Sequence, residues 1–198
     1  MRTARPVVVG VVIGIALSVC SLGVAGLVYL RSTGLGTRGE AGALETAMAA
    51  RARRLAIPAS TRARQNPVPA SVESLDDGMA HFADHCATCH ANDGSGDTEL
   101  GRGFFPRAPD MRLPATQQLS DGELFHIIEQ GIRFTGMPGW STGTAAGEES
   151  TWHLVHFLRH LPRLSADELE GMKARNPRSP AEIRAELEEE RFLSGAKP

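Results

Sequence analysis

Residues 86–90 read Cys-Ala-Thr-Cys-His, and this stretch decides the fold. Two thiols three positions apart, with a histidine directly after the second, form the pattern of c-type haem attachment. Each thiol adds to one vinyl group of the porphyrin, and the adjacent imidazole then projects under the iron as an axial ligand. We therefore expect Cys86 and Cys89 to hold one haem c covalently and His90 to bind its iron.

Other uses of a cysteine pair fit this chain less well. A structural zinc site needs four ligands, and with three cysteines in the whole chain no second pair exists. A thioredoxin-like redox site needs a βαβ setting, and no run of alternating apolar residues predicts a sheet. A structural disulfide gives no reason for the adjacent His90.

Two further stretches strengthen the haem interpretation, Leu119-Ser-Asp-Gly-Glu-Leu124 and Gly131-Ile-Arg-Phe-Thr-Gly-Met-Pro-Gly-Trp140. With the cysteine motif, they make about residues 74–162 similar to the class I cytochrome c family, specifically the compact monohaem domains found with cbb3-type oxidases. The resemblance implies an all-α fold with long loops wrapped round a covalent haem, and a crossing of the first and last helices. It also implies that Met137 supplies the sixth iron ligand.

The residues themselves leave two methionines open for that position. Only Met111 and Met137 lie on loops after the attachment motif within the expected domain. Met137 is favoured because it follows a glycine and precedes Pro138, which would stiffen its loop. A methionine that only fills the core is the ordinary alternative.

The remaining histidines have a plainer interpretation. His81 and His85 are four residues apart, as are His156 and His160, with His153 nearby. This spacing can bind a metal, but no thiol or acidic partner is placed with them, so helix-surface positions are favoured. For His90, the resemblance implies a carbonyl near Pro106 or Pro109 that accepts its second imidazole proton.

The N-terminal region predicts a membrane anchor. Residues 7–30 read VVVGVVIGIALSVCSLGVAGLVYL without a charge, and as a helix they cover about 36 Å, enough to cross a bilayer. Arg5 and Arg31 flank the run, and Tyr29 lies where an interfacial aromatic belongs. A cleaved signal peptide and a lipoprotein signal ending at Cys20 remain alternatives.

The chain after the apolar run consists of a basic segment followed by an acidic one. Residues 31–70 hold seven Arg and two Glu, a net charge of +5, whereas residues 71–164 hold six Arg and thirteen acidic residues, a net of −7. We expect an anchor (1–30), a basic Pro-containing linker (31–70), a haem domain (71–164) and a charged helical tail (165–198). The linker is either a solvated spacer or a segment whose arginines rest on anionic lipid headgroups.

Capping signals predict the helices of the haem domain and tail. A helix over 76–85 begins near Ser74, a second over about 121–130 begins with the Ser120/Glu123 capping box, and a third over 151–161 begins at Ser150. Residues 92–116 form a long loop between the first two. Gly78 is expected to allow close approach of the third helix. Further capping boxes begin at Ser165 and Ser179.

These features predict a membrane-tethered monohaem cytochrome that carries single electrons, not an enzyme, because a His/Met-ligated iron has no open position. The acidic domain favours a redox protein partner with a basic docking patch. An aromatic content of 5% argues against nucleic acid. The resemblance places the haem domain on the periplasmic side of the bacterial inner membrane. A haem subunit of a larger respiratory oxidase or dehydrogenase, and less favourably a ligand-binding haem sensor or enzyme, are the alternatives.

Overall fold

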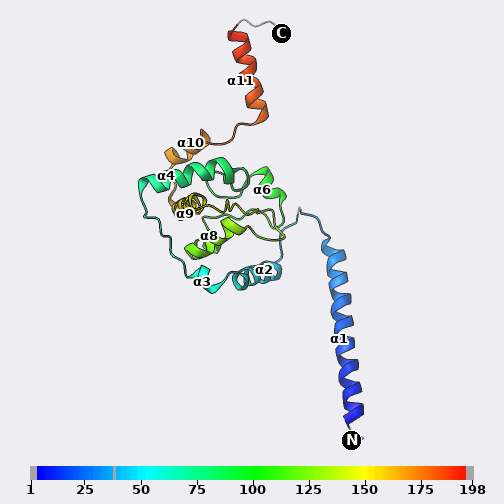
Figure 1. Cartoon of the computed structure of the whole chain (residues 1–198). Coiled ribbons are helices and arrows are strands. Elements are labelled where there is room, and N and C mark those ends of the chain that lie inside the picture. The colour runs from blue at the N-terminus through cyan, green and yellow to red at the C-terminus, as the bar shows by residue number, and fades with distance from the viewer. Residues whose placement is uncertain (1–3, 38, 195–198) are drawn as a thin grey trace. The chain divides into compact units, whose positions relative to one another are not determined.

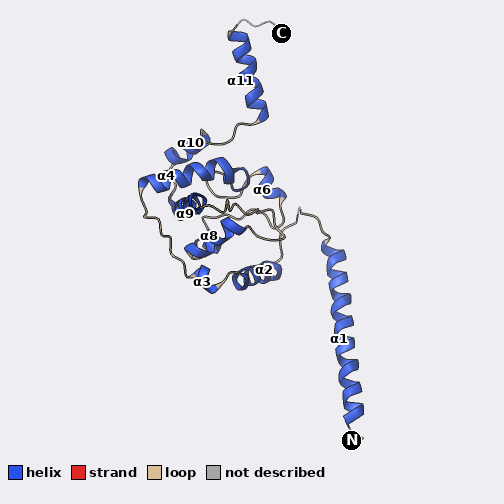
Figure 2. Ribbon diagram, in the orientation of Figure 1, coloured by secondary structure: helices blue, strands red, loops and turns tan. Residues whose placement is uncertain are grey.

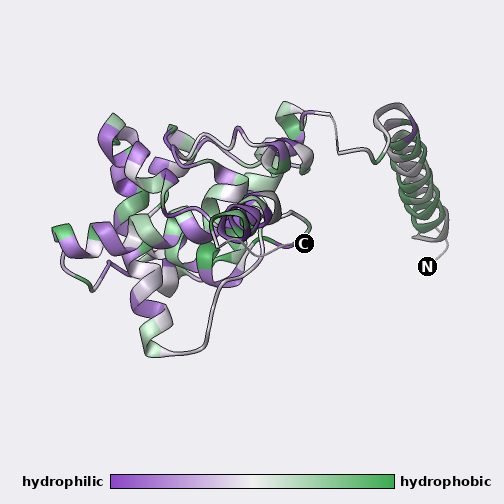
Figure 3. Cartoon of the chain, turned by 90° about the horizontal axis from the view of Figure 1, so that it is seen from above, coloured by the Kyte–Doolittle hydropathy of each residue, from purple (hydrophilic) through white to green (hydrophobic). Residues whose placement is uncertain are grey.

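The computed structural model describes residues 4–37 and 39–194, in two units that divide after Gly39. The first unit is one helix, α1 (Ala4–Thr33) (Figure 1). Within Val7–Thr33, a window of 18 residues has a mean hydropathy of 2.6 and none of it is buried, and most of the α1 ribbon is green in Figure 3. The hydroxyls of Ser18 and Thr33 donate to carbonyls one turn earlier. The helix is therefore long and apolar enough to cross a membrane.

The second unit is helical, and within residues 40–194 the structure contains no β-strand (Figure 2). The expected all-α fold is confirmed. Its elements are α2 (Ala43–Ala56), α3 (Ala59–Arg62), α4 (Val72–His81), the π-helix η1 (Phe82–Cys86), α5 (Ala87–His90), α6 (Glu99–Gly103), α7 (Pro114–Gln117), α8 (Asp121–Gln130), α9 (Ala145–His160), the 3-10 turn η2 (Leu161–Arg163), α10 (Ala166–Lys173) and α11 (Pro180–Leu193).

The core is formed mainly where α4, α8 and α9 meet. Phe82 and Phe157 are almost fully buried, and their ring centroids lie 5.0 Å apart. On the other side of α9, the rings of Phe125 and Trp152 stack at 4.2 Å. Burying a large apolar side chain contributes about 1.5–3 kcal/mol, so these four rings are a main source of the domain's stability.

Gly78 sets the contact between α4 and α9. A Cβ atom at this position would collide with the backbone carbonyl of His153 and approach the Cβ of Phe157 to 3.1 Å. Only glycine allows the two backbones to come this close. The crossing of first and last helices of the haem domain, implied by the resemblance, is thus present.

Two of the predicted helix starts were wrong. α4 begins earlier, after Ser71, because the hydroxyls of Ser71 and Ser74 cap each other's backbone N–H groups and put Ser74 three residues inside the cap. α9 begins after Thr144, whose hydroxyl accepts from the N–H of Gly147. Ser150 instead lies within α9. The capping box of Ser120 and Glu123 is present as predicted.

Residues 57–70 pack against α8 and α9 and do not form a solvated spacer. The side chain of Ile57 is buried, and the Ser120 hydroxyl donates to the carbonyl of Arg62 at 2.8 Å. The Asn66 amide donates to the carbonyl of Trp152 at 2.9 Å. We call residues 57–70 the strap. Before the strap lies α2, none of whose residues is buried.

The C-terminal segment begins as part of the domain. The predicted capping box of Ser165 and Glu168 starts α10, which inserts the fully buried side chain of Met172 into the core. Beyond α10, the guanidinium of Arg175 pairs with Asp76 of α4 at 2.8 Å. The second predicted capping box, at Ser179, begins α11, whose apolar residue Leu187 is exposed.

Candidate haem-binding site

The cysteine motif lies where a continuous helical segment changes from an α-helix to a π-helix and back to an α-helix. α4 runs into the π-helix η1, which ends at Cys86, and α5 then carries Cys89 and His90. Phe82, Ala83 and Ala87 are buried, whereas the two cysteines are only partly buried. The thiols therefore lie at the border of the core. π-helical turns are rare and often occur at functional sites.

The loop after the motif folds back on the carbonyls that end α5. Ala91 terminates the helix with a positive φ of 59°. The N–H of Gly96 then donates to the carbonyl of His90 at 2.8 Å, and the Thr98 hydroxyl donates to that of Cys89 at 3.1 Å. A Cβ atom at Gly101 would collide with the same Cys89 carbonyl. These contacts hold the backbone under the His90 imidazole.

The electrostatics of the site favour neutral sulfur. Burial, with a smaller effect of Cys89, raises the pKa of the Cys86 thiol to about 12. Burial also raises the pKa of Cys89. Reactive and metal-binding cysteines need a thiolate, which this site disfavours. A thioether carries no charge, so attachment of both sulfurs to a porphyrin suits this environment.

The imidazole of His90 is also kept neutral, as an iron ligand requires. Burial lowers its pKa, and the backbone carbonyl of Pro109 acts in the opposite direction. Nδ1 is buried, yet the approach of Pro109 falls short of a hydrogen bond of ordinary geometry. Of the two proline positions that the sequence left open, the structure brings Pro109 to the ring.

The segment that contains Pro109 is fixed to the loop after the motif. The N–H of Ala108 donates to the carbonyl of Gly101 at 3.0 Å, and that of Met111 donates to the carbonyl of Gly94 at 2.8 Å. Gly96 packs so closely on Ala108 that a Cβ atom there would collide with the Ala108 carbonyl. These glycines were not predicted as part of the site, although their spacing in the stretch after the motif was a visible signal.

Met137 is held in a tight loop directly after α8. Its carbonyl accepts from the N–H of Ile132 at 3.1 Å, and its N–H donates to the Thr135 hydroxyl at 3.1 Å. Gly131 turns the chain with a φ of 66°. A Cβ atom at Gly136 would press on the ring of Phe104 at 2.5 Å, so the loop lies against the segment between the motif and α7.

The two candidate methionines have different surroundings. Met111 is 8% exposed and belongs to the hydrophobic core cluster. Met137 is half-buried on its loop. The partly buried thiols of Cys86 and Cys89, the neutral His90 and the Met137 thioether are donor types that a haem c can use.

Residues 73–158 match the family model described as "Cytochrome C oxidase, cbb3-type, subunit III". This part of the chain is a cytochrome c domain. A search of curated proteins finds no match to the chain.

As a cytochrome c domain, this region binds haem c covalently and has an electron-transfer role. The structure agrees with this family: the matched region is helical, begins in α4 and ends within α9. In the described part of the chain, no group of three or more His, Cys, Asp or Glu side chains is arranged to hold a metal ion.

Proposed function

We propose that the chain is a membrane-tethered monohaem cytochrome that passes single electrons between redox proteins. The observation that carries this proposal is the single Cys-Ala-Thr-Cys-His motif, residues 86–90, inside the matched cytochrome c region. Haem c supplies a one-electron Fe(III)/Fe(II) couple. The rest of the proposal concerns what the chain's own residues do.

Cys86 and Cys89 would anchor the porphyrin through two thioethers, and the His90 imidazole and the Met137 thioether would both bind its iron. With both ligands bound, no position would be left for a substrate, so these residues favour electron transfer over catalysis. The carbonyl of Pro109 acts to raise the pKa of His90, and a full hydrogen bond from Nδ1 to this carbonyl would orient the ring.

The anchor α1 and the acidic domain support a proposal for where the chain lies in the cell and for the kind of partner it meets. α1 is proposed to span the bacterial inner membrane once, with the haem domain on the periplasmic side, where attachment to this motif takes place. The charge of −7 over residues 71–164 (six Arg against thirteen acidic residues) favours a partner with a basic docking patch. A tether raises the effective concentration of partners in the same membrane.

A second candidate is a haem subunit of a larger respiratory complex. The matched family model is described as subunit III of a cbb3-type oxidase, which favours this alternative specifically. Electron transfer by the same four residues is common to both candidates, and they differ only in whether the chain works alone or in a permanent assembly.

One preparation tests both candidates. The full chain is extracted from membranes with mild detergent, and its visible spectrum is recorded oxidised, reduced and with CO. A low-spin c-type spectrum with the methionine–iron(III) charge-transfer band, insensitive to CO, supports the electron carrier. Rapid CO binding by the reduced protein would instead support a ligand-binding sensor or enzyme. Stoichiometric co-purification of oxidase or dehydrogenase subunits would support the larger complex.

A further inference from the structure

Two histidine pairs of the domain share the spacing that lets side chains meet on one helix face. His81 and His85 lie at the junction of α4 and η1, and His156 and His160 lie in α9. Residues four apart on a helix are neighbours. Whether such a pair can bind a metal depends on what its ring nitrogens already contact.

In the α9 pair, both Nε2 atoms are occupied. Nε2 of His156 lies 2.8 Å from the carbonyl of Val68, and Nε2 of His160 lies 2.9 Å from the carboxylate of Glu168. These rings join α9 to the strap and to α10. A metal ion would have to break both contacts.

The α4/η1 pair has the opposite arrangement. Nδ1 of His81 lies 2.7 Å from the Ser150 hydroxyl, and Nδ1 of His85 lies 3.2 Å from the Asp84 carboxylate. The structure gives oxygen partners only to the Nδ1 atoms of these two rings. An Nδ1–H bond to oxygen leaves Nε2 unprotonated in a neutral ring, and metal-binding histidines are oriented in this way.

The separation between the two rings is compatible with two ligands of one ion. Their centroids lie 4.8 Å apart, with an angle of 76° between planes. A metal–nitrogen bond of about 2.0–2.1 Å places the centroid of an imidazole ring about 3.2 Å from the ion. When the two ion-to-ring directions make an angle of about 90–110°, the ring centroids are about 4.5–5.2 Å apart. The measured separation falls inside that range.

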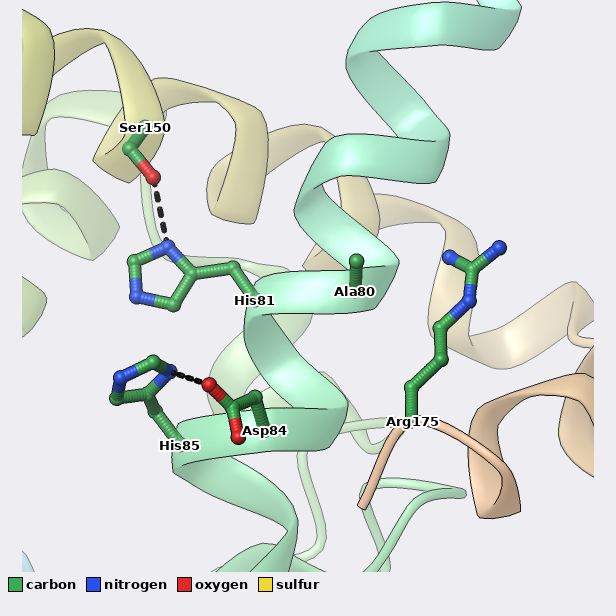
Figure 4. Close-up of a pocket in the computed structure, with 6 residues that line it drawn as sticks. All are labelled: Ala80, His81, Asp84, His85, Ser150 and Arg175. Carbon is green, nitrogen blue, oxygen red and sulfur yellow. Dashed lines mark hydrogen bonds and ion pairs between the residues drawn. The ribbon is translucent and has the colours of Figure 1, made fainter. Parts of the chain in front are cut away.

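The surroundings allow a cation to enter. Both rings project from the same side of the helix, and Arg175 projects on the other side of the ribbon (Figure 4). The two histidines and Arg175 line the same open hollow. That guanidinium is also paired with Asp76. The side chain of His85 is 44% exposed, and Trp140 packs edge-on against its ring at 5.5 Å. Water can therefore complete the coordination of a metal ion.

Protonation competes less with a metal ion at His81 than at an ordinary histidine. Burial lowers the pKa of His81, the neighbouring His85 lowers it further, and Asp84 raises it in part. A neutral His81 is the form that binds a metal.

We propose that Nε2 of His81 and Nε2 of His85 bind one divalent transition-metal ion, with Cu(II) bound more tightly than Ni(II) or Zn(II). Imidazole suits all three ions, and Cu(II) gives the strongest complexes of the series. Because His85 directly precedes Cys86, a bound dication lies close to the haem attachment point. Its charge then favours the reduced form of the haem, so metal binding raises the reduction potential.

The test titrates the oxidised full chain in detergent with Cu(II) alone, by equilibrium dialysis and electron paramagnetic resonance. We expect one Cu(II) per haem, with hyperfine splitting from two nitrogens. His81→Gln and His85→Gln should each weaken binding by about tenfold or more, and Ser150→Ala, which releases Nδ1 of His81, by about tenfold. Each variant is first checked for an unchanged haem spectrum, so that a folding defect is recognised.

His160→Gln is the matched control, because this residue has the same helical spacing but an occupied Nε2. It should bind Cu(II) like the unaltered chain. Redox-silent Zn(II) should raise the haem potential of the unaltered chain and of His160→Gln, but not of His85→Gln. Cu(II) binding that survives both the His81 and His85 substitutions, or that is lost equally in His160→Gln, would overturn the proposal. The binding readout is independent of which redox partner the cytochrome serves.

Discussion

Gly78 of α4 faces the backbone carbonyl of His153 in α9 with no room for a side chain between them. We predict that Gly78→Ala lowers the free energy of unfolding by about 1–3 kcal/mol, because the added methyl forces two packed helices apart. The intrinsic helix preference of alanine, about 0.5–1 kcal/mol, offsets only part of this loss. Denaturant unfolding of the haem-loaded domain measures the effect.

Gly171 provides the control for this prediction. It lies in α10, and a Cβ atom there would meet no atom within 4 Å. Gly171→Ala should therefore leave stability unchanged or raise it by up to about 1 kcal/mol. Equal destabilisation by both substitutions would show that the α4–α9 contact is not the reason for glycine at position 78.

The same contact illustrates how much of the fold the sequence predicted. Gly78 and the Ser120/Glu123 capping box are local signals, and each led to a correct element or packing. The starts of α4 and α9 were missed because Ser74 and Ser150 also look like caps. Ser74 acts as the third residue of a box that begins at Ser71, and Ser150 faces His81. Several polar residues compete for one local role, and tertiary packing selects among them.

The sequence likewise predicted some parts of the haem site and not others. The spacing of Cys86, Cys89 and His90 identified the attachment motif because covalent chemistry requires that spacing. Which of Pro106 and Pro109 approaches His90 was not predictable, because the choice depends on how the Gly94–Gly101 loop turns back on the motif. The packing of the strap was also missed because it depends on tertiary contacts. In the sequence alone, arginines in this segment indicate contact with solvent or with lipid headgroups.

Arg64 of the strap supports a second prediction. Its guanidinium lies 4.5 Å from the ring centroid of Phe125 and 5.1 Å from that of Trp152. Arg64→Ala should cost about 1 kcal/mol of stability, since a partly exposed cation–π contact contributes about that much. Thermal unfolding measures the loss, and limited proteolysis should show faster cleavage within 57–70. Arg51→Ala in the exposed α2 is the control, and an equal loss there would refute a specific role for the strap.

The docking of α10 should depend on pH through Glu168. Hydrogen bonds from the Ser165 backbone N–H, then from the Ser165 hydroxyl and His160, lower the pKa of this carboxyl below its usual 4.5. A lowered pKa means that the ionised form is favoured in the folded state. Its stabilising effect is complete above pH 4.5 and is lost as the pH falls through the lowered pKa.

Glu168→Gln should therefore reduce stability by about 0.5–1 kcal/mol at neutral pH, the size of one capping interaction. The difference from the unaltered chain should shrink as the pH falls below 4.5. Thermal unfolding between about pH 3 and pH 7, a range that spans the usual carboxyl pKa, tests this. Glu170→Gln, in the same helix but 73% exposed, should show no such trend. A Glu168 effect that is constant with pH would contradict the argument.

The choice between Met137 and Met111 as iron ligand can be decided with two substitutions of different kinds. Met137→Ala should remove the methionine–iron(III) charge-transfer band, lower the reduction potential and allow the reduced protein to bind CO, because the loop then presents no sulfur. Met111→Leu conserves volume in the core, so it should cost less than about 1.5 kcal/mol of stability and keep the band. The reverse pattern would assign the ligand to Met111, although that residue is packed in the core. In that case the Met137 loop would affect the haem only through its packing on Phe104. Gly136→Ala, which would press on the Phe104 ring, should then change the spectrum as strongly as Met137→Ala does.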